Sequence, residues 1–186
     1  FGSLLSTGTN TVTGLVTLSG GRLATVDTNT MTLTGGVTNG AAGASILVGA
    51  FAINNKPINV GANAIQFAGD GNNPPAVTGK TIQLNVAGNT WSDASLFFCA
   101  ITRLGVDNAM PAGGTVHFGF LNDDLGRSTL DLNGHNQTVA TIETTANALA
   151  ASGNTLSITG GGTLTVNQSA GSKVFTGIIS DGATPT

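Results

Sequence analysis

Apolar residues alternate with threonine, serine and asparagine along most of this chain, and glycine-rich corners interrupt the alternation every few residues. Successive side chains of a β-strand point to opposite faces, so a period of two predicts short strands with one buried face. The pattern predicts strands over residues 12–18, 30–34, 45–48, 58–60, 64–68, 81–86, 95–101, 115–120, 129–132, 137–142, 155–159, 163–166 and 174–179. Helical periodicity is almost absent, and only residues 143–151 would tolerate a helix, where a turn or a strand fits equally well.

The strand-like segments restate one another loosely at uneven intervals. A repeating segment of this kind cannot bury its apolar face alone and must stack on similar segments. We therefore predict an all-β fold, a right-handed parallel β-helix. A β-sandwich is the alternative, because its many short strands give a similar pattern; the single Trp and the absence of Tyr favour the β-helix.

The domain prediction is one β-solenoid segment over residues 1–186. Residues 1–86 form divergent coils, with a loop near 69–76 where Pro74 and Pro75 interrupt pairing, and residues 87–182 carry clearer repeats. The chain begins and ends within repeat-like sequence, without a signal peptide, which leads us to expect a portion of a longer passenger or fibre protein.

Composition narrows the function classes. Charged residues make up 8% of the chain and hydrophobic residues 40%, which favours a folded protein over a disordered linker. The net charge of −3 provides no basic surface for nucleic acid or anionic membranes. No apolar stretch approaches the length of a membrane helix. Cys99 is the only cysteine, so no intrachain disulfide is possible, and its apolar neighbours predict a buried, unreactive thiol.

Three motifs in the second half of the chain carry a family resemblance. They are Gly88-Asn89-Thr90-Trp91, then Leu104-Gly105 with Asn108-Ala109-Met110-Pro111, then Leu130-Asp131-Leu132-Asn133-Gly134 with Asn136-Gln137-Thr138. Together they resemble the autotransporter-associated β-strand repeat of bacterial autotransporter passenger domains. The segment Phe175 to Gly182 is similar to a further piece of that repeat, whereas Ser92 to Ser95 departs from the Thr-Gly-Gly-Thr turn of the family.

The resemblance implies a secreted parallel β-helix displayed on the bacterial cell surface, and it implies no catalytic residue. The expected function is a structural or adhesive segment of an exported surface protein or extracellular fibre, without a cofactor. Expected partners are other copies of the chain, further coils of a parent chain, or a host or matrix glycan or protein. The alternative is a polysaccharide-active β-helix enzyme, either a lyase or a depolymerase; a trimeric phage tail fibre is a third possibility.

Candidate chemistry is sparse. The densest ionisable group is Asp123, Asp124, Asp131, His135 and Glu143. Asp123 and Asp124 are adjacent and would point in opposite directions on a strand, and Asp131 and His135 lie in a corner motif. We therefore interpret the group as solvated corners. His117 is predicted to face solvent, between Val116 and Phe118. The segment Asp70 to Asn73 lacks the further acidic residue of a calcium loop, so we predict a turn there and no metal site.

Two groups of apolar residues have predicted positions. Leu130, Leu132, Leu156, Ile158, Leu164 and Val166 are expected to point inward, with Thr129, Asp131, Thr155, Ser157 and Thr165 outward. A β-helix also exposes an unpaired coil at each end unless something covers it. The residues predicted for self-association at such ends are Phe1, Leu4, Leu5, Phe175, Ile178 and Ile179.

Overall fold

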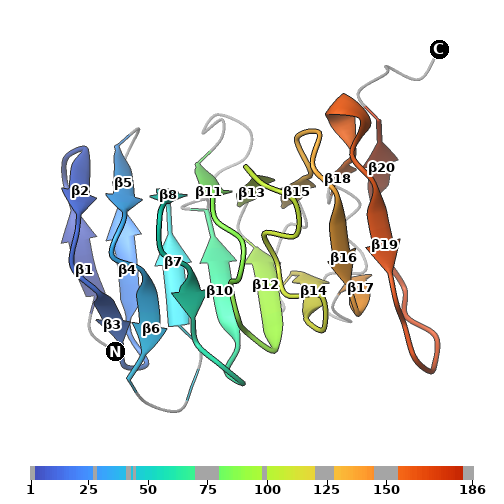
Figure 1. The fold of residues 1–186 in the computed structure, drawn as a ribbon, viewed down its shortest axis with the longest axis horizontal. Coiled ribbons are helices and arrows are strands. Elements are labelled where there is room, and N and C mark those ends of the chain that lie inside the picture. The colour runs from blue at the N-terminus through green and yellow to red at the C-terminus, as the bar shows by residue number, and fades with distance from the viewer. Residues whose placement is uncertain are drawn as a thin grey trace.

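The computed structural model describes residues 3–26, 29–40, 43, 45–69, 80–97, 100–119, 128–144 and 155–181. Within them the chain forms an all-β solenoid, and each strand pairs in parallel with strands of the neighbouring coils (Figure 1). The predicted parallel β-helix is therefore confirmed. The β-sandwich alternative is wrong, because sandwiches are built from antiparallel sheets.

Each coil crosses three faces of the solenoid. Sheet A contains β1 (Ser3–Ser6), β4 (Arg22–Thr25), β7 (Ser45–Val48), β10 (Ile65–Ala68), β12 (Asp93–Phe97), β14 (Thr115–Phe118) and β17 (Thr141–Thr144). Sheet B contains β2 (Asn10–Val12), β5 (Thr30–Leu33), β8 (Ala50–Ile53), β11 (Thr81–Leu84), β13 (Ile101–Leu104), β15 (Thr129–Asp131), β18 (Thr155–Ser157) and β20 (Ile178–Ser180). The third face carries one sheet of β3 (Val16–Leu18), β6 (Val37–Asn39) and β9 (Ile58–Asn59), and another of β16 (Gln137–Val139) and β19 (Leu164–Val166). A 3-10 turn, η2 (Thr159–Gly161), precedes β19.

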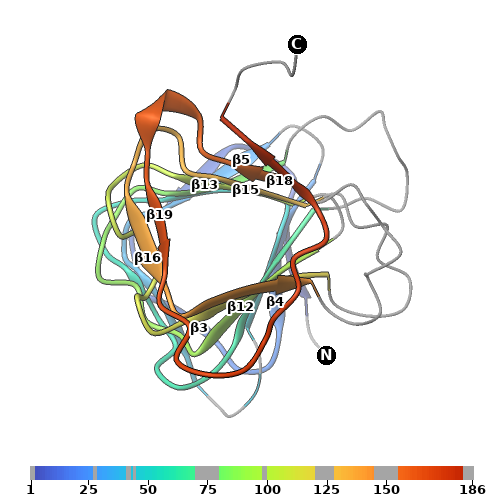
Figure 2. The same cartoon turned by 90° about the vertical axis from the view of Figure 1, so that its right-hand side faces the viewer.

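Figure 2 looks along the solenoid axis from its C-terminal end. The chain advances toward the viewer as it runs from sheet A to sheet B and on to the third face, which is a counter-clockwise path. The coils therefore wind in the right-handed sense, the hand that parallel crossovers almost always take.

Coil length varies mainly at one corner. Ser3 pairs with Arg22, 19 residues later, whereas Ile65 pairs with Ala94, 29 residues later. Only Gly49 separates β7 from β8 at the corner between sheets A and B, but twelve residues, 69–80, separate β10 from β11 there. Connections at the other two corners are shorter than this wherever strands are assigned on both sides. We call this variable edge of the solenoid the A–B corner.

Four predicted strands run through corners and are wrong in their bounds. The prediction 174–179 runs from a segment beside β17, where the carbonyl of Val174 accepts from Thr144 N–H, into β20 of sheet B. The prediction 95–101 joins the end of β12 to the start of β13, which lies in a different sheet. The prediction 137–142 includes the corner at Ala140, and 12–18 includes the one between β2 and β3. Neither a charged residue nor a proline marks the corners in these segments, so the sequence gave no sign of the change of face. The strands β1, β4, β6 and β8 were not predicted.

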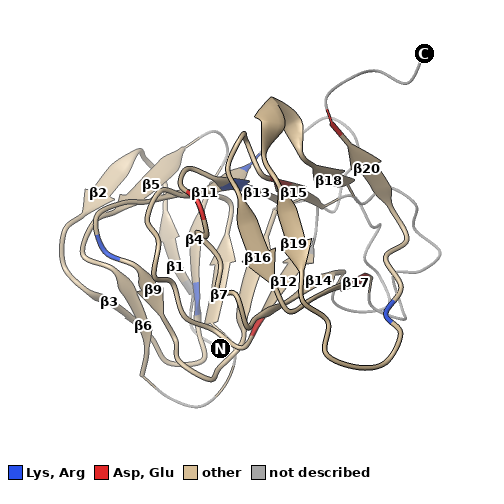
Figure 3. Ribbon diagram, turned by 45° about the vertical axis from the view of Figure 1, so that its right-hand side comes forward, with Lys and Arg blue, Asp and Glu red and all other residues tan. Residues whose placement is uncertain are grey.

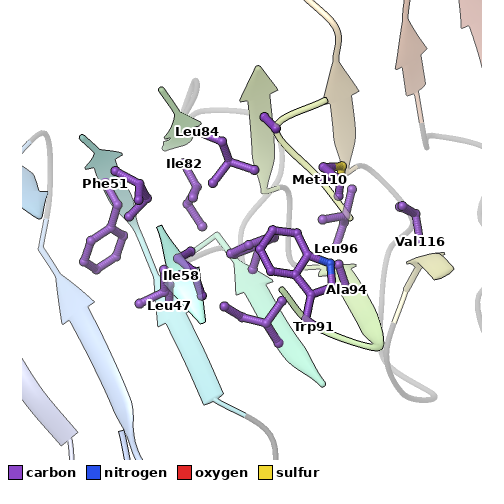
Figure 4. Packing of buried hydrophobic residues seen from close by; sticks show 14 of the residues in the cluster. Leu47, Phe51, Ile58, Ile82, Leu84, Trp91, Ala94, Leu96, Met110 and Val116 are labelled. Carbon is purple, nitrogen blue, oxygen red and sulfur yellow. The ribbon is translucent and has the colours of Figure 1, made fainter. Parts of the chain in front are cut away.

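Apolar side chains from the three faces fill the interior in rows that follow the axis (Figure 4). In sheet A one in-register row consists of Leu23, Leu47, Phe67, Leu96 and Phe118. In sheet B the equivalent row consists of Met31, Phe51, Ile82, Thr102, Leu130, Leu156 and Ile179. Trp91 meets Phe67 edge-on, with ring centroids 5.7 Å apart. Coils before and after residue 87 contribute to the same continuous core.

The predicted inward residues largely occupy the core. Leu130, Leu132 and Leu156 are buried, and Ile158 and Leu164 are partly buried against the cluster. Val166 pairs with the fully buried Val139 but is 44% exposed, because no described strand covers it on the next coil. Asp131 lies on the outer side of its strand as predicted, yet it is buried rather than solvated.

Motif residues replace strand pairing where the third face has no regular strand. Ile58 N–H donates to Asn89 Oδ1 at 2.7 Å, and Asn89 Nδ2 donates to the carbonyl of Ala109 at 2.6 Å. The buried Gln137 likewise bonds to the backbone of the preceding coil. Its side chain accepts from Met110 N–H and donates to Met110 C=O. The buried amides thus satisfy backbone groups that would otherwise lack partners.

The motif glycine at 105 has a steric role. Asn85 Nδ2 donates to Asn54 Oδ1 on the preceding coil at 2.7 Å. A Cβ atom at Gly105 would collide with the side-chain oxygen of Asn85. Glycine at this position therefore leaves room for an asparagine ladder along the corner between sheet B and the third face.

We predict that Leu132→Ala lowers the free energy of unfolding by about 2–5 kcal/mol, because it leaves a cavity in a core position with no exposed surface. Leu132→Asp should prevent the neighbouring coils from folding, since the charge has no partner. Gln83→Asp, an outward position on sheet B, is the matched control and should melt close to the wild type. A Leu132→Asp variant that melts like wild type would show that this row does not face inward.

We predict that Asn89→Ala destabilises the chain by about 1–3 kcal/mol for each buried backbone group it leaves unpaired. Thr90→Ala is the control, because the Thr90 hydroxyl makes its bond to Asn59 on the exposed surface. Chemical denaturation of the two variants and the wild type measures the difference. Equal stability of the Asn89 and Thr90 variants would contradict the bridging role.

Candidate functional site: charged groups on the outer faces

Charged residues are few, and Figure 3 shows them at scattered positions along the described chain. One connected group among the described residues follows sheet A across successive coils. It consists of Asp93 at the start of β12, His117 in β14, Glu143 in β17 and Lys173 in the segment before β20. We call these four residues the sheet A ladder.

The ladder is a chain of contacts between oppositely charged groups. His117 Nε2 lies 3.4 Å from Asp93 Oδ1, and His117 Nδ1 lies 2.9 Å from Glu143 Oε1. Lys173 Nζ lies 2.8 Å from Glu143 Oε2. The outer members are about half-exposed, whereas the side chains of His117 and Glu143 are 23% and 18% exposed. His117 thus lies on the outer face as predicted, but neighbouring side chains shield it.

Each contact of the ladder from Asp93 to Glu143 joins one coil to the next. A protonated imidazole can donate to both carboxylates, whereas a neutral one donates to only one. The Ser92 hydroxyl, beside the ladder, donates to Asp93 Oδ2 at 2.9 Å, so its proton is directed to a carboxylate. Glu143 Oε1 contacts His117 Nδ1 and Oε2 accepts from Lys173, so each of its oxygens has a partner.

A second charged contact crosses sheet B. Arg103 Nε donates to Asp131 Oδ2 at 2.8 Å, and Asp131 Oδ1 accepts from the backbone of Asn133 at 3.0 Å. The Thr159 hydroxyl also approaches Asp131 Oδ1, at 3.4 Å. Asp131 was predicted to be a solvated corner; it is instead a shielded carboxylate that joins three coils.

A third group occupies the corner that precedes β16. Asp107 Oδ1 accepts from the backbone of Asn136 at 3.0 Å and lies 3.3 Å from His135 Nδ1. The Asn136 backbone N–H is the main cause that lowers the pKa of Asp107 below 3.8, and the side chains of Asn136 and His135 lower it further. Because Asn136 also accepts from Thr163 N–H, this corner connects successive coils through polar contacts.

The predicted ionisable group does not assemble into one site. Glu143, Asp131 and His135 belong to three separate contacts, and Asp123 and Asp124 lie outside the described residues. Cys99 and the segment Asp70 to Asn73 also lie outside them. The contacts that bring Asp93, His117 and Lys173 together were not predicted, because these contacts depend on the length of each coil. Among the residues that the structure describes, no three His, Cys, Asp or Glu side chains are placed to hold a metal ion.

The described part of the chain also contains no helix with the length and hydrophobicity needed to cross a membrane. Comparisons of the chain with protein-family models, with curated proteins and with solved structures found no match. The similarity to the autotransporter-associated repeat therefore rests on the motif residues alone.

We predict that Glu143 and Lys173 are coupled by at most about 1 kcal/mol, and that added salt weakens the coupling, since Lys173 is nearly half-exposed. A double-mutant cycle with Glu143→Gln and Lys173→Met, measured by denaturation at low and high salt, gives the coupling energy. A coupling that is absent at low salt would contradict the contact.

We predict that Asp107→Asn reduces stability near neutral pH and that this difference from wild type disappears in acid. A carboxyl whose folded pKa is lowered contributes stability above its unfolded pKa, near 3.8, and this contribution is lost as the pH falls through the folded value. Melting temperatures of both proteins across this pH range provide the test. A difference that persists unchanged in acid would show that ionisation of Asp107 is not involved.

Proposed function

We propose that the chain is a structural or adhesive segment of a bacterial exported surface protein or extracellular fibre. In this role it is a stiff β-solenoid that holds a binding surface away from the cell or spans part of a fibre. It needs no cofactor, and neither nucleic acid nor insertion into a membrane is part of the role. Its partners are further coils of a parent chain, other copies of itself, or a host or matrix glycan or protein.

The observation that carries this proposal is that the charged groups connect neighbouring coils to each other. The contacts of Asp93, His117 and Glu143, of Arg103 with Asp131, and of Asp107 with His135 all join one coil to another. Polar side chains that hold coils together stiffen a rod, and they leave few groups free for chemistry on a substrate. The resemblance to passenger-domain repeats supports the same conclusion independently.

The A–B corner is the edge that we propose for adhesive contact. Insertions in solenoid proteins concentrate on one side, and that side often binds partners. Here the connection varies from the single residue Gly49 to the twelve residues 69–80, while the strands on either side keep their register. Contact residues at this edge could therefore change without a change in the coil stack.

The alternative function is a polysaccharide lyase or depolymerase. The feature that favours it is the histidine between two carboxylates on the outer side of sheet A. In that case uronic-acid polymers would be cleaved, and His117→Ala would abolish cleavage with the fold intact. We expect no cleavage by the wild-type chain.

Labelling of intact bacteria that express the natural protein tests the proposal. Antibodies against the folded 186-residue chain should decorate the cell surface or extracellular fibres, and electron microscopy should show rods at the labelled positions. Labelling that requires cell lysis would contradict export. Cleavage of a polysaccharide that depends on His117 would replace the structural function with the enzymatic one.

A further inference from the structure

The exposed apolar residues of the first and last described coils do not identify a partner. Four residues predicted for self-association are exposed there: Leu4, Leu5, Ile178 and Ile179. Further coils of a parent chain and other copies of this chain would cover them equally well. Phe175 packs partly against Phe118 of its own chain, with ring centroids 5.0 Å apart, and Phe1 lies outside the described residues. Self-association through these residues stays a prediction, whereas contacts between inner coils do not depend on what covers the ends.

The imidazole of His117 lies between two carboxylates that belong to the coils on either side of it. In sheet A, His117 of β14 pairs with Ser95 of β12 and with Glu143 of β17. Its Nε2 faces Asp93 Oδ1 at 3.4 Å, and its Nδ1 faces Glu143 Oε1 at 2.9 Å. The imidazole therefore connects three successive coils through its two ring nitrogens.

Only the protonated ring satisfies both of these contacts. An imidazolium carries an N–H on each nitrogen and can donate to both carboxylates, whereas a neutral ring has one N–H and one lone pair. The contact with Glu143 is the shorter of the two, so the neutral ring keeps its N–H there. Its lone pair then points at Asp93 Oδ1, and the attraction between the coils of β12 and β14 is lost.

The charged groups around His117 leave the Asp93 contact as the part that depends on the proton. Among the described residues, Asp93 faces the ring from β12 and Glu143 faces it from β17, and β14 contains no other titratable side chain. Lys173, in the segment before β20, binds the second oxygen of Glu143 at 2.8 Å and so compensates this carboxylate when the ring is neutral. Ser92 Oγ donates to Asp93 Oδ2, which leaves Oδ1 to face the ring. The side chains of His117 and Glu143 are less than a quarter exposed, so solvent screens their contact only in part.

We infer that His117 is a pH-sensitive clasp between the coils of β12, β14 and β17. Histidine in general titrates near about pH 6.5, within the range that living cells and their surroundings cover. A histidine bound by carboxylates contributes stability while its ring is protonated, and this contribution is lost as the pH rises. The clasp is therefore complete in mild acid and loses its Asp93 contact in mild alkali. It is a property of the chain itself, and the proposed location outside the cell would expose it to the pH of the medium.

Loss of the Asp93 contact loosens one coil boundary without unfolding the stack. β12 and β14 remain paired over four residues, from Asp93 with Thr115 to Leu96 with Phe118. The side chains of Leu96 and Phe118 also stay in the core, where neither has exposed surface. The expected change is therefore more frequent local opening between these two strands, which makes the rod less stiff at this boundary.

The second histidine of the chain provides an internal comparison. His135 Nδ1 lies 3.3 Å from Asp107 Oδ1, and the ring has no second charged contact among the described residues. A neutral ring with one N–H can keep a single contact of this kind. Deprotonation should therefore weaken the contact of His135 less than it weakens the two contacts of His117.

Thermal unfolding of the whole 186-residue chain and of His117→Gln, between about pH 5.5 and 8.5, tests the clasp. Glutamine is polar and stays neutral throughout this range. The wild type should melt about 2–4 °C above the variant at the acid end, and the difference should shrink as the pH rises. His135→Gln is the matched control, and its difference from wild type should change less with pH.

Asp93→Asn separates the clasp from a general effect of histidine charge. This variant leaves His117 with one carboxylate, as His135 has, so its stability should gain less than that of the wild type when the pH is lowered. A wild-type advantage over His117→Gln that is constant with pH would overturn the clasp. An Asp93→Asn variant with the full pH dependence of the wild type would also overturn it.

Hydrogen exchange of the wild-type chain tests the same inference without any variant. Protection factors of the β14 amides should fall several-fold between the acid and alkaline ends of the range, relative to those of β4 and β7, whose strands contain no histidine. These measurements use the purified chain, so they are independent of the labelling that tests export. Equal changes in protection at β14 and at β4 and β7 would overturn the clasp even if every variant failed to fold.

Discussion

The whole structure depends on the stacking of one coil on the next. A single coil has no interior of its own, so its apolar side chains are buried only between neighbouring coils. The sheet A row makes this plain, because Leu47, Phe67 and Leu96 have no exposed surface in the middle of the stack while Leu4 is two-thirds exposed at its start. Position along the axis, more than residue type, decides whether a leucine of this chain is in the core.

Polar residues obey the same constraint. Asn89 and Gln137 supply hydrogen bonds to backbone groups of adjacent coils where no strand does so, and Arg103 and Asp131 join sheet B across a coil boundary. Several residues that carry the family resemblance are therefore residues that hold coils together. A match to such a motif argues for an architecture, and the function has to be sought elsewhere on the molecule.

The sequence was sufficient for the fold class and for much of the core, because alternation with a period of two places Leu130, Leu132 and Leu156 on one side of their strands. It was insufficient for contacts between coils. His117 lies 24 residues after Asp93, and the coil length varies, so alternation alone could not show that they are neighbours. The same uncertainty hid Arg103 above Asp131, and a correctly placed outward carboxylate was therefore taken as solvated.

Coil stacking also determines where the chain between strands can vary in length. Connections at the A–B corner range from one to twelve residues without disturbing the register of β7 with β10 or of β8 with β11. Stacking therefore constrains the strands of each coil, whereas the length of the connection at this corner differs from coil to coil, and this is why the A–B corner is the edge proposed for adhesive contact.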